Sequence, residues 1–203
     1  MIEALYKPFQ KWSEVGTVWI YSDPHFGDKE LAAGIKDRPT AEEQVKMINA
    51  KVGRKDTLII LGDIGDIEYA KQLRGYKVLV CGNHDVGHTK YAEVFDEIYA
   101  GPVFIADRLV LSHEPIMLDF AFNIHGHNHS SVIQDGKHLN VCSDMIGYTP
   151  INFNQFVKSG ALAKVPSIHR VTIDGATERK QKRLKKGKKK NLTNVKIFSI
   201  ISM

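Results

Sequence analysis

Short apolar runs recur along the first two-thirds of this chain, and segments with helical spacing separate them. The runs TVWIYS at 17–22 and TLIIL at 57–61 are rich in β-branched residues and typical of buried strands. Thr40 and Glu43 form a capping-box pattern that predicts a helix from about Ala41 to Val52. Strands that alternate with helices indicate an α/β protein built in layers.

The same patterns predict the other elements of a single layered domain. Strands are expected at Lys77–Cys81, Phe122–His125 and His138–Cys142, a helix at Ile67–Arg74, a hairpin from Val103–Ala106 and Arg108–Ser112, and an edge strand at Ile168–Ile173. After Gly175 the composition becomes rich in lysine. We therefore expect a domain over residues 1–175 and a basic C-terminal tail over residues 176–203.

Residue types that bind metal ions follow the predicted strands, at the points where each strand ends. They are Asp23 and His25 (SDPH), Asp63 (LGD), Asn83 and His84 (GNHD), His113 (LSHEP), and His127 and His129 (HGHNH). Strand carboxyl ends meet at one crevice in layered α/β folds, so we expect these side chains to converge. Glycines beside them suit sharp turns at which a neighbouring Cβ atom would find no room.

The number and kind of these side chains favour two metal ions over one. Nitrogen and carboxylate ligands suit Mn, Fe, Zn or Ni, and the seven candidates other than His84 are too many for one tetrahedral site. A shared carboxylate holds two ions roughly 3.5–4 Å apart. Two such ions neutralise phosphate oxygens and lower the pKa of a bound water. The pattern therefore predicts metal-dependent hydrolysis of a phosphate ester.

The ordered motifs D-x-H, GD, GNHD, H and GHxH resemble the signature of the calcineurin-like metallophosphoesterases over about residues 17–150. The stretches SDPHFG, DRPTAEEQ and NVCSDMIGYTPI further resemble the small bacterial and phage members of that family. The resemblance implies a four-layer αββα sandwich, in which two mixed β-sheets pack face to face with helices outside.

The resemblance also implies a role for each motif residue. It assigns Asp23, His25 and His129 to one metal ion and Asn83, His113 and His127 to the other, with Asp63 bridging both. His84 becomes the general acid and a phosphate contact, with Asp85 orienting its imidazole. Mn is the expected metal, with Fe, Zn or Ni as alternatives.

Four further residues near the motifs need an interpretation. Asp28 stands where the small relatives often have a histidine, and a carboxylate that faced the substrate would repel phosphate. Arg38 is either a bidentate phosphate contact or a surface arginine. Asp66 is interpreted as an acid at the start of a helix, ahead of a role beside the metal ligands. His125 is expected to be structural and to point away from the site.

Phosphodiester hydrolysis is the preferred function, because a histidine that protonates an alkoxide helps a poor leaving group depart. A phosphomonoesterase acting on a small metabolite or nucleotide is the alternative within the enzymes. A nuclease that uses the basic tail is a further hypothesis. A non-catalytic scaffold would have lost metal ligands, whereas all seven are present here.

Positive charge is concentrated near the C-terminus. Residues 179–190 hold nine of the 28 basic residues, which leaves 19 basic against 23 acidic residues elsewhere. The rest of the chain therefore lacks the basic excess of a nucleic-acid-binding protein. We expect the tail to be a solvated, disordered segment, with binding to nucleic acid through phosphate neutralisation as the second interpretation.

The sequence favours a cytoplasmic protein and does not indicate its oligomeric state. No apolar run reaches the roughly 20 residues that a membrane helix requires, and the N-terminus lacks the pattern of a signal peptide. Cys81 and Cys142 are expected to be buried, reduced thiols.

Overall fold

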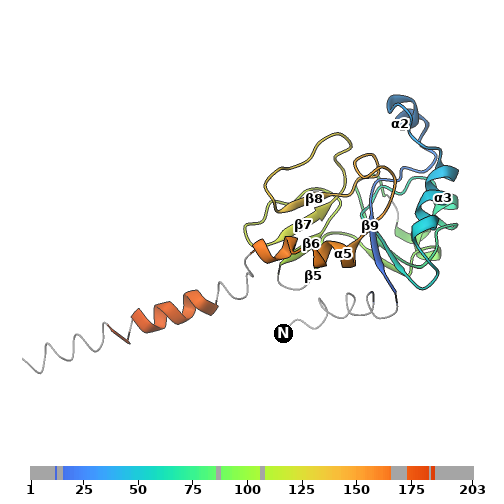
Figure 1. Ribbon diagram of the computed structural model, residues 1–203. Coiled ribbons are helices and arrows are strands. Elements are labelled where there is room, and N and C mark those ends of the chain that lie inside the picture. The colour runs from blue at the N-terminus through green and yellow to red at the C-terminus, as the bar shows by residue number, and fades with distance from the viewer. Residues whose placement is uncertain are drawn as a thin grey trace, which may run out of the picture. The chain divides into compact units, whose positions relative to one another are not determined.

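The computed structural model describes residues 12, 16–85, 88–105, 108–165, 173–182 and 184–185. The chain divides into two compact units, residues 1–165 and residues 166–203, so the division lies before the expected boundary at residue 175. The first unit contains two mixed β-sheets with helices around them (Figure 1).

The first sheet has five strands, four of them parallel. Its order is β4 (Glu97–Tyr99), β3 (Tyr76–Val80), β2 (Thr57–Ile60), β1 (Val18–Tyr21) and β9 (Ile151–Asn152). Strand β9 pairs antiparallel with β1, and the other neighbours are parallel. All four residues of β2 are buried, as expected for a central parallel strand that is covered on both faces.

The second sheet has four strands and includes the predicted hairpin. Its order is β5 (Val103–Ile105), β6 (Leu109–Leu111), β7 (Phe122–His125) and β8 (His138–Asn140). Strands β5 and β6 are antiparallel, which confirms the hairpin, whereas β6, β7 and β8 run parallel.

The helices of the first unit are short, with α3 the longest among the described residues. They are α2 (Lys29–Gly34), α3 (Ala41–Lys51), α4 (Ile67–Ala70), α5 (Phe153–Lys158) and the 3₁₀ helices η2 (His88–Glu93) and η3 (Ala161–Lys164). The predicted capping box of α3 is present, with Thr40 Oγ1 accepting from the Glu43 N–H and the Glu43 carboxylate accepting from the Thr40 N–H.

Helix α4 is shorter than the predicted helix at 67–74. It ends at Ala70, and Gly75, with a φ of 87°, turns the chain into β3. The side chain of Asp66 accepts a hydrogen bond from the Glu68 N–H, so this carboxylate caps α4, as the helix interpretation of Asp66 expected.

The two faces of the five-stranded sheet enter different apolar cores, because neighbouring residues of a strand point to opposite faces. One core lies between the sheets and contains Ile20, Ile59 and Val78. The other contains Ile60 of the sheet together with Ile48 of α3. Each buried isoleucine contributes about 1.5–3 kcal/mol relative to an exposed one, so both faces of the sheet stabilise the strand ends that position the site.

The second sheet differs from the expected four-layer arrangement. No helix separates β6, β7 and β8 in the described chain, so loops connect these parallel strands. The loop over residues 112–121 contacts the outer face, where the Ile116 N–H donates to Asn123 Oδ1 at 2.8 Å and Ile116 O lies 3.1 Å from His138 Nε2. A loop therefore occupies the place at which the resemblance implied an outer helix layer.

The second unit is helical over residues 173–182. An exposed ion pair joins Lys182 Nζ and Glu178 Oε2 at 3.8 Å. The predicted strand at 168–173 lies outside the described residues except for Ile173, which belongs to this helix, and most of the basic tail lies outside them too.

Two further expectations, on the cysteines and on membrane-spanning helices, can be compared with the described residues. Neither Cys81 nor Cys142 forms a disulfide in the described chain. Cys142 is buried as predicted, whereas Cys81 is only half-buried. None of the helices that the structure describes has the length and apolar character needed to cross a bilayer.

Replacing Thr40 with alanine should lower the free energy of unfolding by about 1 kcal/mol, because the Glu43 N–H loses its acceptor at the start of α3. Chemical denaturation measures this change. Thr149→Ala is the matched control, since the Thr149 hydroxyl donates only to the nearby Gly147 carbonyl, and should have a smaller effect. Equal losses in both variants would contradict the cap.

Candidate metal centre

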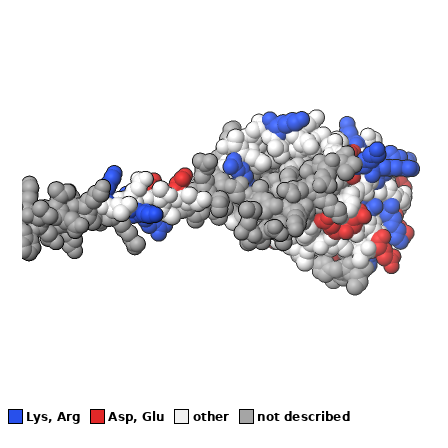
Figure 2. All heavy atoms as spheres, turned by 90° about the horizontal axis from the view of Figure 1, so that it is seen from below, with Lys and Arg blue, Asp and Glu red and all other residues white. Residues whose placement is uncertain are grey.

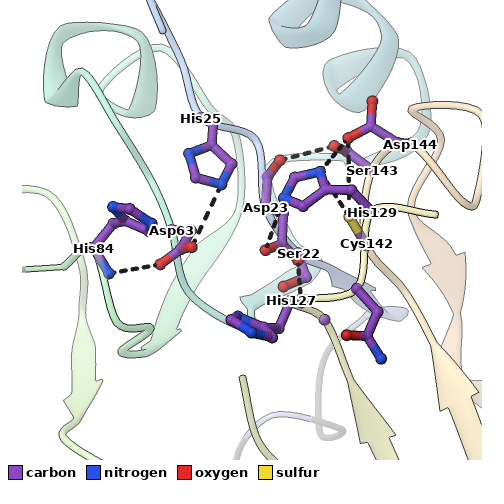
Figure 3. A network of polar contacts seen from close by, with 12 residues as sticks. Ser22, Asp23, His25, Asp63, His84, His127, His129, Cys142, Ser143 and Asp144 are labelled. Atoms are coloured by element: carbon purple, nitrogen blue, oxygen red, sulfur yellow. Dashed lines mark hydrogen bonds and ion pairs between the residues drawn. The ribbon is translucent and has the colours of Figure 1, made fainter. Parts of the chain in front are cut away.

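The seven predicted metal ligands lie together at one end of the two sheets. Figure 3 shows Asp23, His25, Asp63, His127 and His129 among them. They come from the loops that follow β1, β2, β3, β6 and β7. An isolated bridge between Ser22 and Cys142 joins the two sheets at this end. The predicted convergence of strand carboxyl ends is therefore present.

Asp63 lies between the two predicted ligand sets. Its Oδ2 atom is 3.4 Å from His25 Nε2 and 3.4 Å from His113 Nε2, while Oδ1 accepts a hydrogen bond from the His84 N–H at 3.0 Å. Burial raises the pKa of this carboxyl, but its neighbours His25, His84 and His113 hold the pKa below its ordinary value overall. An ionised carboxylate that faces one histidine of each set is suited to bridging two cations.

Asn83, His113 and His127 form a tight cluster of donor atoms. His113 Nε2 is 2.8 Å from Asn83 Oδ1 and 3.1 Å from His127 Nδ1. His113 Nδ1 lies 2.8 Å from the Leu61 carbonyl oxygen, to which it donates its proton, so Nε2 of the neutral ring carries a lone pair. Three facing atoms then share at most one proton, and a cation relieves the repulsion between their lone pairs.

Two buried atoms at the centre lack hydrogen-bond partners in the described chain. They are Asp23 Oδ1 and His25 Nε2. Asp23 Oδ1 lies 3.8 Å from His129 Nε2, too far for a hydrogen bond but close enough for both atoms to bind one ion. Buried polar atoms are nearly always paired, so these two atoms favour a ligand between them. The Asp and His clusters thus fit divalent transition-metal ions.

Cys142 is close to one cluster, although the sequence did not indicate it as a ligand. Its sulfur belongs to a group with Asp23 and His129 whose donor atoms lie within 4.8 Å of one another. The sulfur is 3.5 Å from His129 Nδ1, the ring nitrogen opposite Nε2. Burial raises the pKa of this thiol far above its ordinary value. We therefore place Cys142 as a neutral thiol behind the imidazole.

Four of the proposed ligands have left-handed backbone conformations. The φ values are 55° at Asp23, 42° at His25, 55° at Asp63 and 66° at His127. Such conformations cost on the order of 1–3 kcal/mol each in non-glycine residues and concentrate at functional sites. The strain is retained where the backbone must turn sharply to aim the side chain into the centre.

Two glycines permit close packing around the carboxylates. A Cβ atom at Gly82 would lie 2.3 Å from Asp63 Oδ1, and one at Gly126 would lie 2.2 Å from Asp23 Oδ2. Any larger residue would displace these carboxylates. The glycines of the GNHD and GHxH motifs therefore have the steric role that the sequence suggested.

Asp85 has a different place from the one predicted for it. Its Oδ2 atom accepts from the N–H groups of Asp63 and Gly82, both at 2.8 Å. Its Oδ1 atom accepts from the Ile64 N–H and the Tyr91 hydroxyl, both at 3.0 Å. The carboxylate thus joins the loops after β2 and β3 and does not orient the His84 imidazole.

Arg38 is neither a phosphate contact nor a surface arginine, because only 2% of its side chain is exposed. Its guanidinium donates to the Asp144 carboxylate and to the Pro24 carbonyl oxygen at 2.9 Å. A weaker hydrogen bond reaches the Asp23 carbonyl oxygen at 3.2 Å. The side chain therefore supports the loop that carries Asp23 and His25.

Asp144 is a site residue that the sequence interpretation did not single out, although it lies in the stretch NVCSDMIGYTPI. Its Oδ2 atom accepts from His129 Nδ1 at 2.6 Å, and its Oδ1 atom accepts from the Tyr148 hydroxyl. Burial raises the pKa of Asp144, but the hydrogen bonds from His129, Tyr148 and Arg38 hold it well below its ordinary value. The carboxylate keeps the proton of His129 on Nδ1 and turns Nε2 toward Asp23.

Asp28 and His125 lie beside the centre. Asp28 Oδ1 caps α2 by accepting from the Leu31 N–H at 2.9 Å, and Oδ2 is 3.8 Å from His25 Nδ1. His125 is fully buried, and its Nδ1 lies 2.8 Å from Gly126 O. These contacts give Asp28 a helix-capping role and His125 the structural place expected for it.

Comparison with known proteins gives few relatives. No protein-family model and no curated protein matches the chain significantly. A solved structure of a protein of unknown function from Aquifex aeolicus is similar, with a TM-score of 0.59 and 25% identity over 70% of this chain and 98% of that one. A nuclease, MPE, from Pseudomonas putida matches with a TM-score of 0.42 and 21% identity over 59% of this chain and 65% of its own. The first match indicates a shared fold, whereas the second is too weak to support an argument.

Asp144→Asn should weaken metal binding by about 10–100-fold, because the neutral amide is a poorer acceptor for His129 Nδ1. Competition with a chromogenic chelator measures the affinity. Asp135→Asn is the matched control, since Asp135 contacts His138 Nδ1 at 2.9 Å on the outer face of the second sheet. An unchanged metal affinity in Asp144→Asn would contradict the orienting role.

Proposed function

We propose that this protein is a calcineurin-like metallophosphoesterase that hydrolyses a phosphodiester with two divalent metal ions. The convergence of two carboxylates, four histidines and one asparagine on a centre with unpaired buried atoms carries this proposal. Such a donor set is suited to hard or borderline divalent cations rather than to an organic ligand.

The chain offers a set of donors for each ion. Asp23, His25 and His129 would hold one ion and Asn83, His113 and His127 the other, with Asp63 shared. When bound, the ions would supply charge neutralisation for phosphate oxygens and a water of lowered pKa. Mn is the expected metal, and Fe, Zn and Ni suit the same donors.

His84 is the proposed general acid. It is exposed at the edge of the centre, its ring centroid lies 5.5 Å from that of His25, and its N–H is bonded to Asp63 Oδ1. This position leaves the imidazole accessible to a substrate while the backbone stays attached to the centre. In the proposed reaction His84 gives a proton to the departing alkoxide.

The complete ligand set argues against a non-catalytic scaffold, which would have no need for strained, buried ligands. A phosphomonoesterase remains the alternative within the enzymes.

A nuclease must bind a polyanion. The visible face of the first unit carries acidic as well as basic side chains (Figure 2), and such a mixed surface does not favour binding of a polyanion. Any nucleic-acid binding is therefore assigned to the basic tail.

A substrate screen tests the function directly. The Mn²⁺-loaded protein should hydrolyse bis-p-nitrophenyl phosphate faster than p-nitrophenyl phosphate at equal concentration. Cyclic nucleotides and single-stranded nucleic acid complete the panel. Absence of hydrolysis of every ester, with two metal ions bound per chain, would contradict the proposal.

Asp63→Ala should lose both metal ions, because Asp63 is the ligand that the two sets share. Elemental analysis of the purified variant measures the metal content, and circular dichroism checks the fold. Asp66→Ala is the control, since Asp66 caps α4 in the same loop without facing the centre, and should keep both ions. Full metal occupancy in Asp63→Ala would refute the bridging assignment.

His84→Ala should keep its metal ions and lose turnover by roughly 10²–10⁴-fold, as expected when a general acid is removed. The loss should be smaller for esters of p-nitrophenol, whose anion departs without a proton. Steady-state rates on activated and unactivated diesters decide this. Equal losses on both classes would mean that His84 positions phosphate without donating a proton.

A further inference from the structure

A hollow of about 260 Å³ opens beside Asn83 and His113. Among the described residues, three segments line it: residues 81–83 after β3, residues 100–102 between β4 and β5, and residues 112–116 after β6. Asn83 and His113 belong to the proposed metal ligands, so a phosphate held there would lie at the edge of the hollow. The remaining lining residues are not proposed ligands or acids, although Gly82 leaves room for the Asp63 carboxylate.

The walls of the hollow are poorly suited to an anion. Pro102, Pro115 and Ile116 supply apolar surface, and no Lys or Arg is among the described residues that line it. Glu114 is exposed at the lining, and its carboxylate makes no hydrogen bond or ion pair with the described chain. Apart from the ion proposed at Asn83 and His113, the described lining offers an anionic group no counter-charge.

The hollow lies on a different side of Asn83 from the proposed acid. His84 does not line it, and the His84 ring contacts the His25 ring instead. The alcohol that departs must lie beside His84 to receive its proton. A group in the hollow is therefore the substituent that stays on phosphorus.

We propose, building on the proposed function, that this hollow binds the retained alcohol substituent of a phosphodiester, and that this substituent is small, largely apolar and not anionic. The volume equals about nine water molecules at about 30 Å³ each, which is enough space for a single substituted ring. A pocket for a second substituent also gives a physical reason for diester rather than monoester hydrolysis.

Gly101 allows a clean test of the proposal. A Cβ atom there would meet nothing within 4 Å, and its φ is not left-handed, so a larger side chain can reduce the hollow without a backbone clash. Gly175→Leu is the matched control, because Gly175 has the same open surroundings in the second unit. Neither position is a proposed ligand or acid.

The decisive comparison uses two diesters with the same leaving group. Bis-p-nitrophenyl phosphate retains a nitrophenyl group after cleavage, whereas methyl p-nitrophenyl phosphate retains a methyl group. Gly101→Leu should raise KM for the first by about tenfold, the usual effect of excluding an apolar group from its pocket. KM for the methyl ester, and both values in Gly175→Leu, should change less than twofold.

A second comparison tests whether the hollow disfavours an anionic substituent. The unmodified protein should prefer p-nitrophenyl phenyl phosphate to the same diester with a para-carboxylate on the phenyl ring, and Glu114→Gln should reduce this preference. The inference would be overturned if Gly101→Leu changed KM equally for bis-p-nitrophenyl phosphate and methyl p-nitrophenyl phosphate. It would also be overturned if Glu114→Gln left the preference for the uncharged phenyl diester unchanged. Either result leaves the proposed function standing if hydrolysis persists, whereas failure of all diesters refutes the function itself.

Discussion

The buried carboxylate of Asp63 is the feature on which the site depends. One of its oxygen atoms faces His25 and His113 at the same distance, and the other accepts the N–H of His84. Asp85 holds the backbone of Asp63, and Gly82 leaves room for its side chain. Because loops from β1, β2, β3 and β6 all contact this one group, the strand ends of both sheets must be in register for the centre to form.

Much of this arrangement follows from short-range patterns. The apolar run of β2 ends directly before Gly62 and Asp63, and a parallel strand leads its C-terminal residue to the same edge as its neighbours. The capping box of Thr40 and Glu43 placed the start of α3 correctly, because its hydrogen bonds are local. The strands, and the strand ends at which the site residues lie, were therefore predictable where the information lies within a few residues.

Other features depend on contacts between distant segments and could not be predicted from the sequence. Arg38 pairs with Asp144, 106 residues away, and this partner removes the guanidinium from solvent. The acceptor role of Asp85 requires the loop of Asp63 beside it. Helix α2 has no buried residue, so it lacks the apolar spacing that indicates a helix. Strand β9 is two residues long and forms only by pairing with β1.

The two sides of the centre differ in what their residues do: one fixes the geometry of the proposed ligands, and the other lines the hollow. On one side, buried charges fix the geometry, since Asp144 and Arg38 hold the His129 ring and the loop of Asp23. On the other side, residues 100–102 line the hollow, and none of the three has a charged side chain. A substitution at Asp144 would leave a buried guanidinium unpaired and alter every neighbouring contact. A substitution at Gly101 meets open space. On the proposed function, selectivity for the retained substituent can therefore change through the β4–β5 connection while the proposed metal ligands keep their positions.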